Sequence, residues 1–310
     1  MKLTTPKKRG WRYYRNLLLF TLGSALFAFY VVLPIGFAAQ DARRPPARFA
    51  VCCFTPADLG LKYEDVTFPT RDGLTLSGWY IPSQNGAAII AAHARNGNRT
   101  GMIYHADFLA RHGYGVLLFD LRGHGESQGE LWLYGWQGHL DILGAVAYLQ
   151  NRPDVKPNRI GALGLSAGSE VVLHAAAVND QIKAVVSDGA DFRTLQDMYL
   201  AADPATWAYA PGWLLYFSAL TAISGVPSPP SLADLVPQIA PRPLLLIAAG
   251  TAKAEEIKFN RIYYAAAGEP KQLWELPDST HIRGLFSHPE EYQDKVLTFF
   301  DHALLQGNTD

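Results

Sequence analysis

Cysteine and net charge are the two things this chain has least of. Its 310 residues include two cysteines, Cys52 and Cys53, which are adjacent. Neighbouring cysteines rarely reach relaxed disulfide geometry, so a fold held by structural disulfides is excluded. We expect the pair to be small apolar residues near the start of the folded domain, with palmitoylation as a minor alternative. The net charge of -1 lacks the basic surface that nucleic-acid binding needs, so no nucleic-acid partner is expected.

Charge is absent altogether from residues 17 to 39. A helix of that length is about 34 Å long, which is enough to cross a bilayer core. Six basic residues precede this segment and two follow it: Lys2, Lys7, Lys8, Arg9, Arg12 and Arg15, then Arg43 and Arg44. The positive-inside rule predicts a single-pass anchor with its N-terminus in the cytoplasm and the following domain outside it. A cleaved signal peptide is the alternative, although the apolar run exceeds the roughly 7–15 residues of such a peptide.

The rest of the chain is typical of a globular protein, with 49% apolar and 18% charged residues. We expect a basic tail over 1–16, the anchor over 17–39, and a proline-broken linker and domain entry over 40–60. One large domain is expected over 61–310.

Strand and helix patterns alternate within that domain. Short apolar or β-branched runs predict strands, and amphipathic patterns between them predict helices. The strands are expected at 64–68, 74–81, 87–93, 115–120, 159–165, 183–188, 243–250 and 271–276, and the helices at 101–112, 137–150, 168–178, 255–268 and 289–305. The first two strands form a predicted hairpin. The alternation predicts an α/β fold, a mostly parallel eight-stranded sheet with helices on both faces.

One interval is too long to be an ordinary crossover. Residues 189–242 separate two predicted strands and are expected to be a helical cap insertion. Its uncharged stretch 213–226 is too short to span a membrane and predicts a buried helix or an apolar lid.

The segment RIGALGLSAGSE places Ser166 between two glycines, after a predicted strand and before a predicted helix. A serine needs exposure on a sharp turn and a neighbouring base to act as a nucleophile. His281, in the loop after the last strand, is the expected base. His288 is more simply the residue that precedes the final helix, with Pro289 at its first turn.

The acid that would orient His281 has three candidates. Glu256 comes first and Glu255 second, because both follow the strand 243–250. Asp188, at the end of the strand 183–188, is the alternative. For the oxyanion hole, we expect backbone amides near Ala94 and Arg95 in the turn HARNGNR, together with the amide of Ala167.

These motifs resemble the α/β-hydrolase superfamily, and specifically bacterial single-pass, membrane-anchored members of it. The matching pieces are HARNGNR from His93, FDLRGHGES from Phe119 to Ser127, GLSAG from Gly164 to Gly168, PRPLLLI from Pro241, and His281. The sequence departs from the family pattern at Ala94, Ser169 and Lys253, where glycine, glycine and aspartate are usual.

The resemblance implies the chain order serine, acid, histidine and cleavage of an ester or amide. We therefore expect a membrane-anchored, carboxylesterase- or lipase-like serine hydrolase that forms an acyl-enzyme, acts on a hydrophobic acyl ester or thioester, and uses no metal or organic cofactor. A peptidase or amidase on the same fold and a non-catalytic binding module are the alternatives. The oligomeric state is left open.

Overall fold

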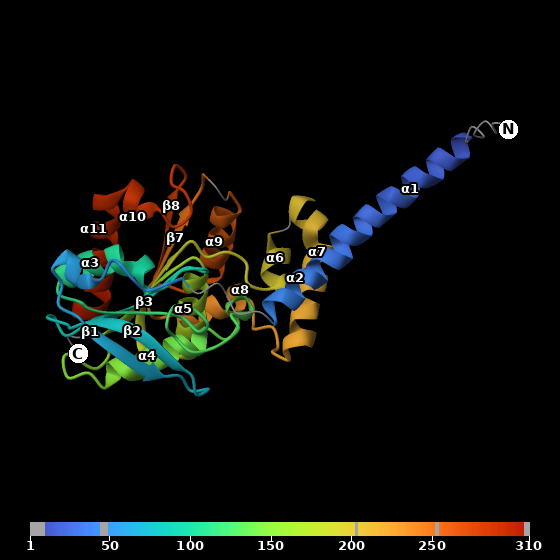
Figure 1. The fold of residues 1–310 in the computed structure, drawn as a ribbon. Coiled ribbons are helices and arrows are strands. Elements are labelled where there is room, and N and C mark those ends of the chain that lie inside the picture. Colours follow the sequence, from blue (N-terminus) through green and yellow to red (C-terminus); the bar gives the residue numbers. More distant parts are fainter. Residues whose placement is uncertain (1–9, 44–48, 202–203, 252–253, 307–310) are drawn as a thin grey trace.

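An eight-stranded sheet forms the centre of the computed structural model, which describes residues 10–43, 49–201, 204–251 and 254–306 (Figure 1). The strand order is β1-β2-β4-β3-β5-β6-β7-β8. The strands are β1 (Glu64–Pro69), β2 (Thr75–Ile81), β3 (Ala88–Ala92), β4 (Gly115–Phe119), β5 (Ile160–Leu165), β6 (Ile182–Asp188), β7 (Leu244–Ala249) and β8 (Lys271–Leu276). All eight lie where the sequence predicts them.

The sheet is mixed at one end and parallel elsewhere, as predicted. β1 and β2 form the antiparallel hairpin, and β2 also pairs antiparallel with β4. Every other pair is parallel. The carboxyl ends of β3, β5, β6 and β7 therefore meet at one edge of the sheet, where ligands bind in folds of this kind.

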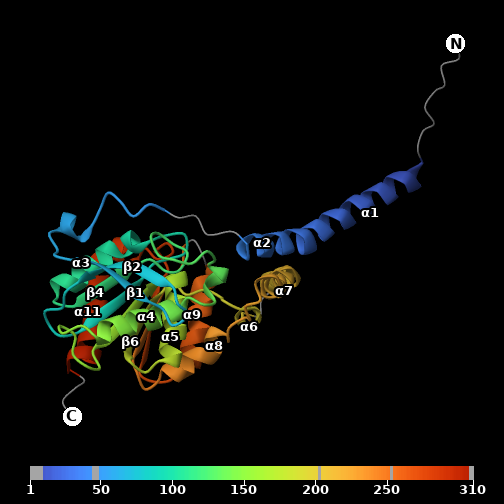
Figure 2. The same cartoon turned by 60° about the horizontal axis from the view of Figure 1, so that its bottom comes forward.

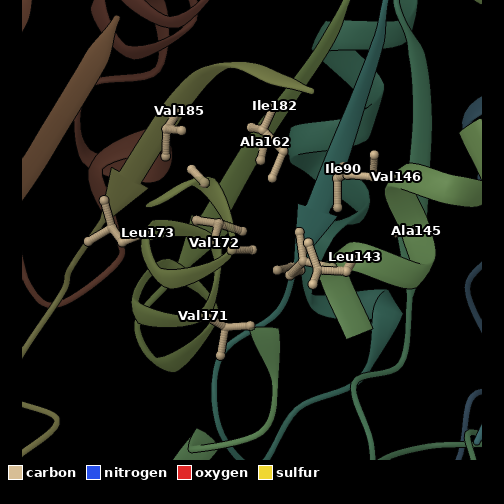
Figure 3. Close-up of a cluster of buried hydrophobic side chains, with 14 of the residues drawn as sticks. Ile90, Leu143, Ala145, Val146, Ala162, Val171, Val172, Leu173, Ile182 and Val185 are labelled. Carbon is tan, nitrogen blue, oxygen red and sulfur yellow. The ribbon is translucent and has the colours of Figure 1, made fainter. Parts of the chain in front are cut away.

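Helices cover both faces of the sheet. One apolar layer joins the strands to α4, α5, α8 and α9, and the other joins them to α3 and α11. The helices are α3 (Ile103–Arg111), α4 (His139–Gln150), α5 (Ala167–Val178), α8 (Leu232–Leu235), α9 (Ala254–Ala266), α10 (Gly284–Ser287) and α11 (Pro289–Phe300). Figure 3 shows part of the first layer, which includes Val171 and Val172 of α5 and Ala162 of β5. Because both faces are covered, β3, β4, β5 and β7 are buried along their whole length.

The long interval between β6 and β7 contains α6 (Leu195–Leu200), α7 (Pro204–Ser224) and α8. Of the uncharged stretch 213–226, predicted as a buried helix or an apolar lid, residues 213–224 form the second half of the longer helix α7. Figure 1 shows α6 and α7 standing beside the sheet domain rather than on its faces.

The N-terminal helix is longer than its uncharged core. It runs through α1 (Trp11–Phe27), one π-helical turn (Ala28–Val32) and α2 (Leu33–Asp41). Within the described residues, Trp11–Asp41 is the one helix long and apolar enough to cross a membrane. Its first part extends away from the domain, whereas α2 lies beside α7 in both views (Figures 1 and 2). Ala38 and Ala42 are buried there in an apolar cluster with Tyr216, Phe217 and Leu220 of α7.

Candidate active site

Ser166 occupies a sharp turn between β5 and α5. Its backbone has φ 53° and ψ -121°, a conformation that residues other than glycine rarely adopt. The amide of Ser166 donates to the carbonyl oxygen of Asp188 at 2.8 Å, which fixes the turn to the end of β6. Such strain persists only where the surrounding structure holds it, and it lifts the serine side chain above the sheet edge.

The two glycines around Ser166 permit close packing. A Cβ on Gly168 would lie 2.6 Å from the carbonyl oxygen of His93 and closer still to that of Ala92. A Cβ on Gly164 would lie 2.6 Å from the amide nitrogen of Ser169. The start of α5 can therefore rest against the end of β3 only because position 168 is glycine. Ser169, where the family pattern has glycine, is buried and donates its hydroxyl to the carbonyl oxygen of Ser166.

Three of the predicted residues meet at this turn. The Nε2 atom of His281 lies 2.8 Å from Ser166 Oγ, and its Nδ1 atom lies 2.5 Å from Glu256 Oε2. Glu256 is fully buried in the first turn of α9, and its Oε1 atom accepts the amide of Ala249 at 2.7 Å. A hydroxyl, an imidazole and a carboxylate joined in this order can activate the hydroxyl for nucleophilic attack.

The other two candidate acids are placed differently. Glu255 is exposed on α9. Asp188 is buried, and its Oδ2 atom accepts the hydroxyl of Tyr292 at 2.8 Å. Burial is the largest cause that raises the pKa of Asp188 to about 7, and the neighbouring charge of Glu256 adds to it. Lys253, at the position where the family usually has aspartate, lies outside the described residues.

His93 anchors the turn that follows β3. Its Nε2 atom accepts the amide of Leu121 at 3.0 Å, so its Nδ1 carries the proton and donates to the carbonyl oxygen of Ala94 at 2.8 Å. Burial, reinforced by the nearby His124, lowers the pKa of His93 to about 4. A neutral histidine with both nitrogens bonded is a positioning group, and it fixes the backbone of Ala94.

The predicted oxyanion donors come from two elements. Ala167 is the first residue of α5, where helix amides have no partner within the helix. In the described part of the chain, the amides of Ala94 and Arg95 also lack a protein acceptor. The positive end of the α5 dipole adds to the attraction for a developing negative charge.

The turn FDLRGHGES is bonded to the turn HARNGNR, which contains the predicted oxyanion donors Ala94 and Arg95. The buried carboxylate of Asp120 accepts the amide of Arg99 at 2.7 Å and its guanidinium at 2.7 Å. It also accepts the amide of Glu126 at 2.8 Å. Arg99 belongs to HARNGNR, so one buried ion pair ties the two motifs together.

A small pocket of about 150 Å³ opens beside Ser166. Sequence reasoning missed four of its lining residues, Trp132, Tyr134, Glu170 and Asp191. Glu170 lies one helical turn after Ser166, and that spacing was a signal that could have found it. Burial is the largest cause that raises the pKa of Glu170 to about 8, followed by the charge of Asp191.

Comparison with known proteins gives the family of the fold. A family model described as alpha/beta hydrolase fold matches residues 87–223. The uncharacterized protein YfhR of Escherichia coli strain K12 is 30% identical over 259 residues, covering 79% of this chain and 83% of that protein. The thiohydrolase aneE of Aspergillus aculeatus is 33% identical over 129 residues, which is 40% of this chain and 41% of that protein.

Solved structures resemble the whole domain. The esterase Pf2001 of Pyrococcus furiosus has a TM-score of 0.66 and 28% identity, and the match covers 84% of this chain and 98% of that one. Fold, sequence and structural relatives agree that the chain belongs to the α/β-hydrolase superfamily.

Proposed function

We propose that this protein is a membrane-anchored serine hydrolase that cleaves an ester or thioester. The observation that carries the proposal is the hydrogen-bonded series from Glu256 through His281 to Ser166, with distances of 2.5 and 2.8 Å. Similarity to an esterase and to a thiohydrolase supports this bond type over an amide.

The proposed reaction proceeds in two halves. The Ser166 oxygen attacks the substrate carbonyl carbon while His281 Nε2 takes the hydroxyl proton. The tetrahedral oxyanion is bound by the amides of Ala167 and of Ala94 or Arg95. When the intermediate collapses, the bond to the alcohol or thiol breaks, and His281 returns the proton to that leaving group.

Water completes the cycle. His281 takes a proton from a water molecule, which attacks the acyl carbon on Ser166. As the bond from that carbon to Ser166 Oγ breaks, His281 returns the proton to Oγ, and a carboxylic acid is released. Glu256 orients the imidazole and stabilises its charged form in both halves.

The N-terminal helix is the membrane anchor in this proposal. The helix Trp11–Asp41 carries exposed apolar side chains along its first part, for example Leu18, Phe20 and Phe27. Basic residues concentrate before it, so we place the N-terminus in the cytoplasm and the hydrolase domain outside. A reporter fused after Asp310 should therefore be active outside the cytoplasm, and activity inside would reverse the orientation.

The test of the nucleophile uses the full chain in detergent. It should react with a fluorophosphonate probe, and Ser166→Ala should abolish labelling. His281→Ala should reduce the labelling rate by several orders of magnitude. His288→Ala is the matched control, because His288 bonds to Asp278 on the surface and not to Ser166. Undiminished labelling of Ser166→Ala would remove the nucleophile from this proposal.

A further inference from the structure

An apolar crevice of about 150 Å³ lies between the anchor helix and α7. Its walls include Phe29, Tyr30 and Phe37 of the anchor helix and Tyr209, Gly212 and Trp213 of α7. None of the described residues that line it is charged. The rings of Phe29 and Tyr209 lie 6.3 Å apart across it.

The length of the anchor helix places this crevice at the membrane surface. The helix has 31 residues and is about 46 Å long at 1.5 Å per residue, whereas the hydrocarbon core is only about 30 Å thick. About eleven residues must therefore lie outside the core. The charged Arg12 and Arg15 belong to the part outside the core at the N-terminal end. About twenty core residues that begin after Arg15 end near residue 36, beside Phe37 of the crevice.

Apolar surface continues from the anchor onto α7. Phe29 and Phe37 of the anchor helix are exposed, and so are Trp207, Tyr209 and Leu214 of α7. The whole of α7 carries no charged side chain. Tryptophan and tyrosine are the residues enriched where hydrocarbon meets the headgroup layer. The crevice thus opens into the lipid layer that the anchor occupies.

The crevice and the Ser166 pocket share a wall of aromatic rings. Trp213 lines the crevice and packs edge-on against Tyr134, which lines the pocket, with ring centres 6.3 Å apart. Asp41, at the end of the anchor helix, contacts one residue of the crevice and one residue of the Ser166 pocket. It accepts the hydroxyl of Tyr216 at 2.5 Å and pairs with Arg95 at 3.4 Å.

We propose that this crevice binds part of the hydrocarbon chain of a lipid ester that reaches Ser166 directly from the membrane. The inference rests on the proposed function, since it names the substrate class of that same site. A dry cavity of about 150 Å³ accommodates a six-carbon ring. The crevice therefore holds about six carbons of a chain whose remainder lies in the lipid layer.

The first test fills the crevice. A Cβ on Gly212 would lie 3.4 Å from Pro34 Cγ, so the ring of Gly212→Phe must occupy the crevice. The full chain in lipid nanodiscs is assayed on 4-methylumbelliferyl palmitate and butyrate. Gly212→Phe should lower the palmitate-to-butyrate ratio of kcat/KM at least tenfold. Leu214→Phe, at an exposed position of α7 outside the crevice, should leave it within twofold.

A second variant tests the same crevice in case Gly212→Phe does not fold. Tyr209→Lys places a charge at an exposed wall of the crevice and should lower the same ratio. An unchanged ratio in both variants would overturn the proposal.

A binding measurement separates this inference from the proposed function. A palmitate carrying a diazirine is photocrosslinked to Ser166→Ala, which cannot turn over substrate. Labelling of the α7 peptide should fall at least fivefold when Gly212→Phe is added, and not with Leu214→Phe. If the parent chain and all variants that keep Ser166 turn over no ester, but the labelling pattern is as expected, the proposed hydrolase function is refuted and the crevice proposal stands. The crevice proposal is refuted if Gly212→Phe leaves the labelling of the α7 peptide unchanged. It is also refuted if α7 is found crosslinked to a second copy of the chain.

Discussion

Replacement of Glu256 by glutamine tests the acid of the proposed triad most sharply. The substitution keeps the side-chain volume and removes the charge. Because Oε1 accepts the amide of Ala249 at 2.7 Å, that place must still hold an acceptor. Leaving a buried donor unsatisfied costs about 1–3 kcal/mol. The glutamine oxygen will therefore face Ala249, and its NH₂ group will face His281 Nδ1.

That orientation gives His281 the wrong tautomer. Facing a donor, Nδ1 must become the acceptor, and the proton moves to Nε2, 2.8 Å from Ser166 Oγ. A protonated Nε2 cannot take the serine proton. In an equivalent triad this change costs about 10⁴ in kcat, which is about 5.4 kcal/mol of transition-state stabilisation.

The assay compares turnover of a short-chain ester and the rate of fluorophosphonate labelling, with Tm measured alongside. Glu255→Gln is the control, since that neighbour is exposed. Asp188→Asn should cost tenfold or less, because Asp188 bonds to Tyr292. If Glu256→Gln stays within tenfold of the parent, or Asp188→Asn loses as much as Glu256→Gln, the geometric argument fails.

Two further substitutions probe the scaffold. His105 is buried, neither ring nitrogen has a partner among the described residues, and burial lowers its pKa to about 4. Its folded pKa lies below the usual 6.5, so stability is full above pH 6.5 and is lost on acidification towards pH 4, by about 3 kcal/mol. His105→Phe should remove that loss in denaturant titrations at pH 7 and 4.5, and an unchanged pH dependence would contradict it. Gly168→Ala should lower stability by about 1–3 kcal/mol and abolish probe labelling, since its Cβ would lie 2.6 Å from the carbonyl oxygen of His93; a parental Tm would show that the turn has more room.

The sheet could be predicted from sequence because burial on both faces leaves a strong signal. Strands such as Leu244–Ala249 are apolar throughout, and turns and helices separate them. Ser166 and His281 could be singled out because Ser166 directly follows β5 and His281 lies in the loop after β8, and the carboxyl ends of these two parallel strands lie at the same edge of the sheet.

The choice among the acids could not be made from sequence. Glu255 and Glu256 differ by one position, and the rotation of α9 decides which of them is buried beside His281. The pocket wall was also out of reach. Tyr134 reaches the Ser166 pocket through a turn in which Leu133 and Tyr134 both have positive φ, and no propensity predicts that pair.

The burial of Ala38 and Ala42 against α7 decides how many N-terminal residues the folded domain needs. A soluble version cut within the linker would lose those residues together with Asp41. Tyr216, Phe217 and Leu220 would then face water as a bare apolar patch, of the kind that promotes aggregation. Arg95, beside Ser166, would lose its carboxylate partner. The last turns of the N-terminal helix are thus part of the folded unit that holds Arg95 beside the Ser166 pocket. With the membrane anchoring proposed above, the shortest faithful version of this protein keeps its membrane helix.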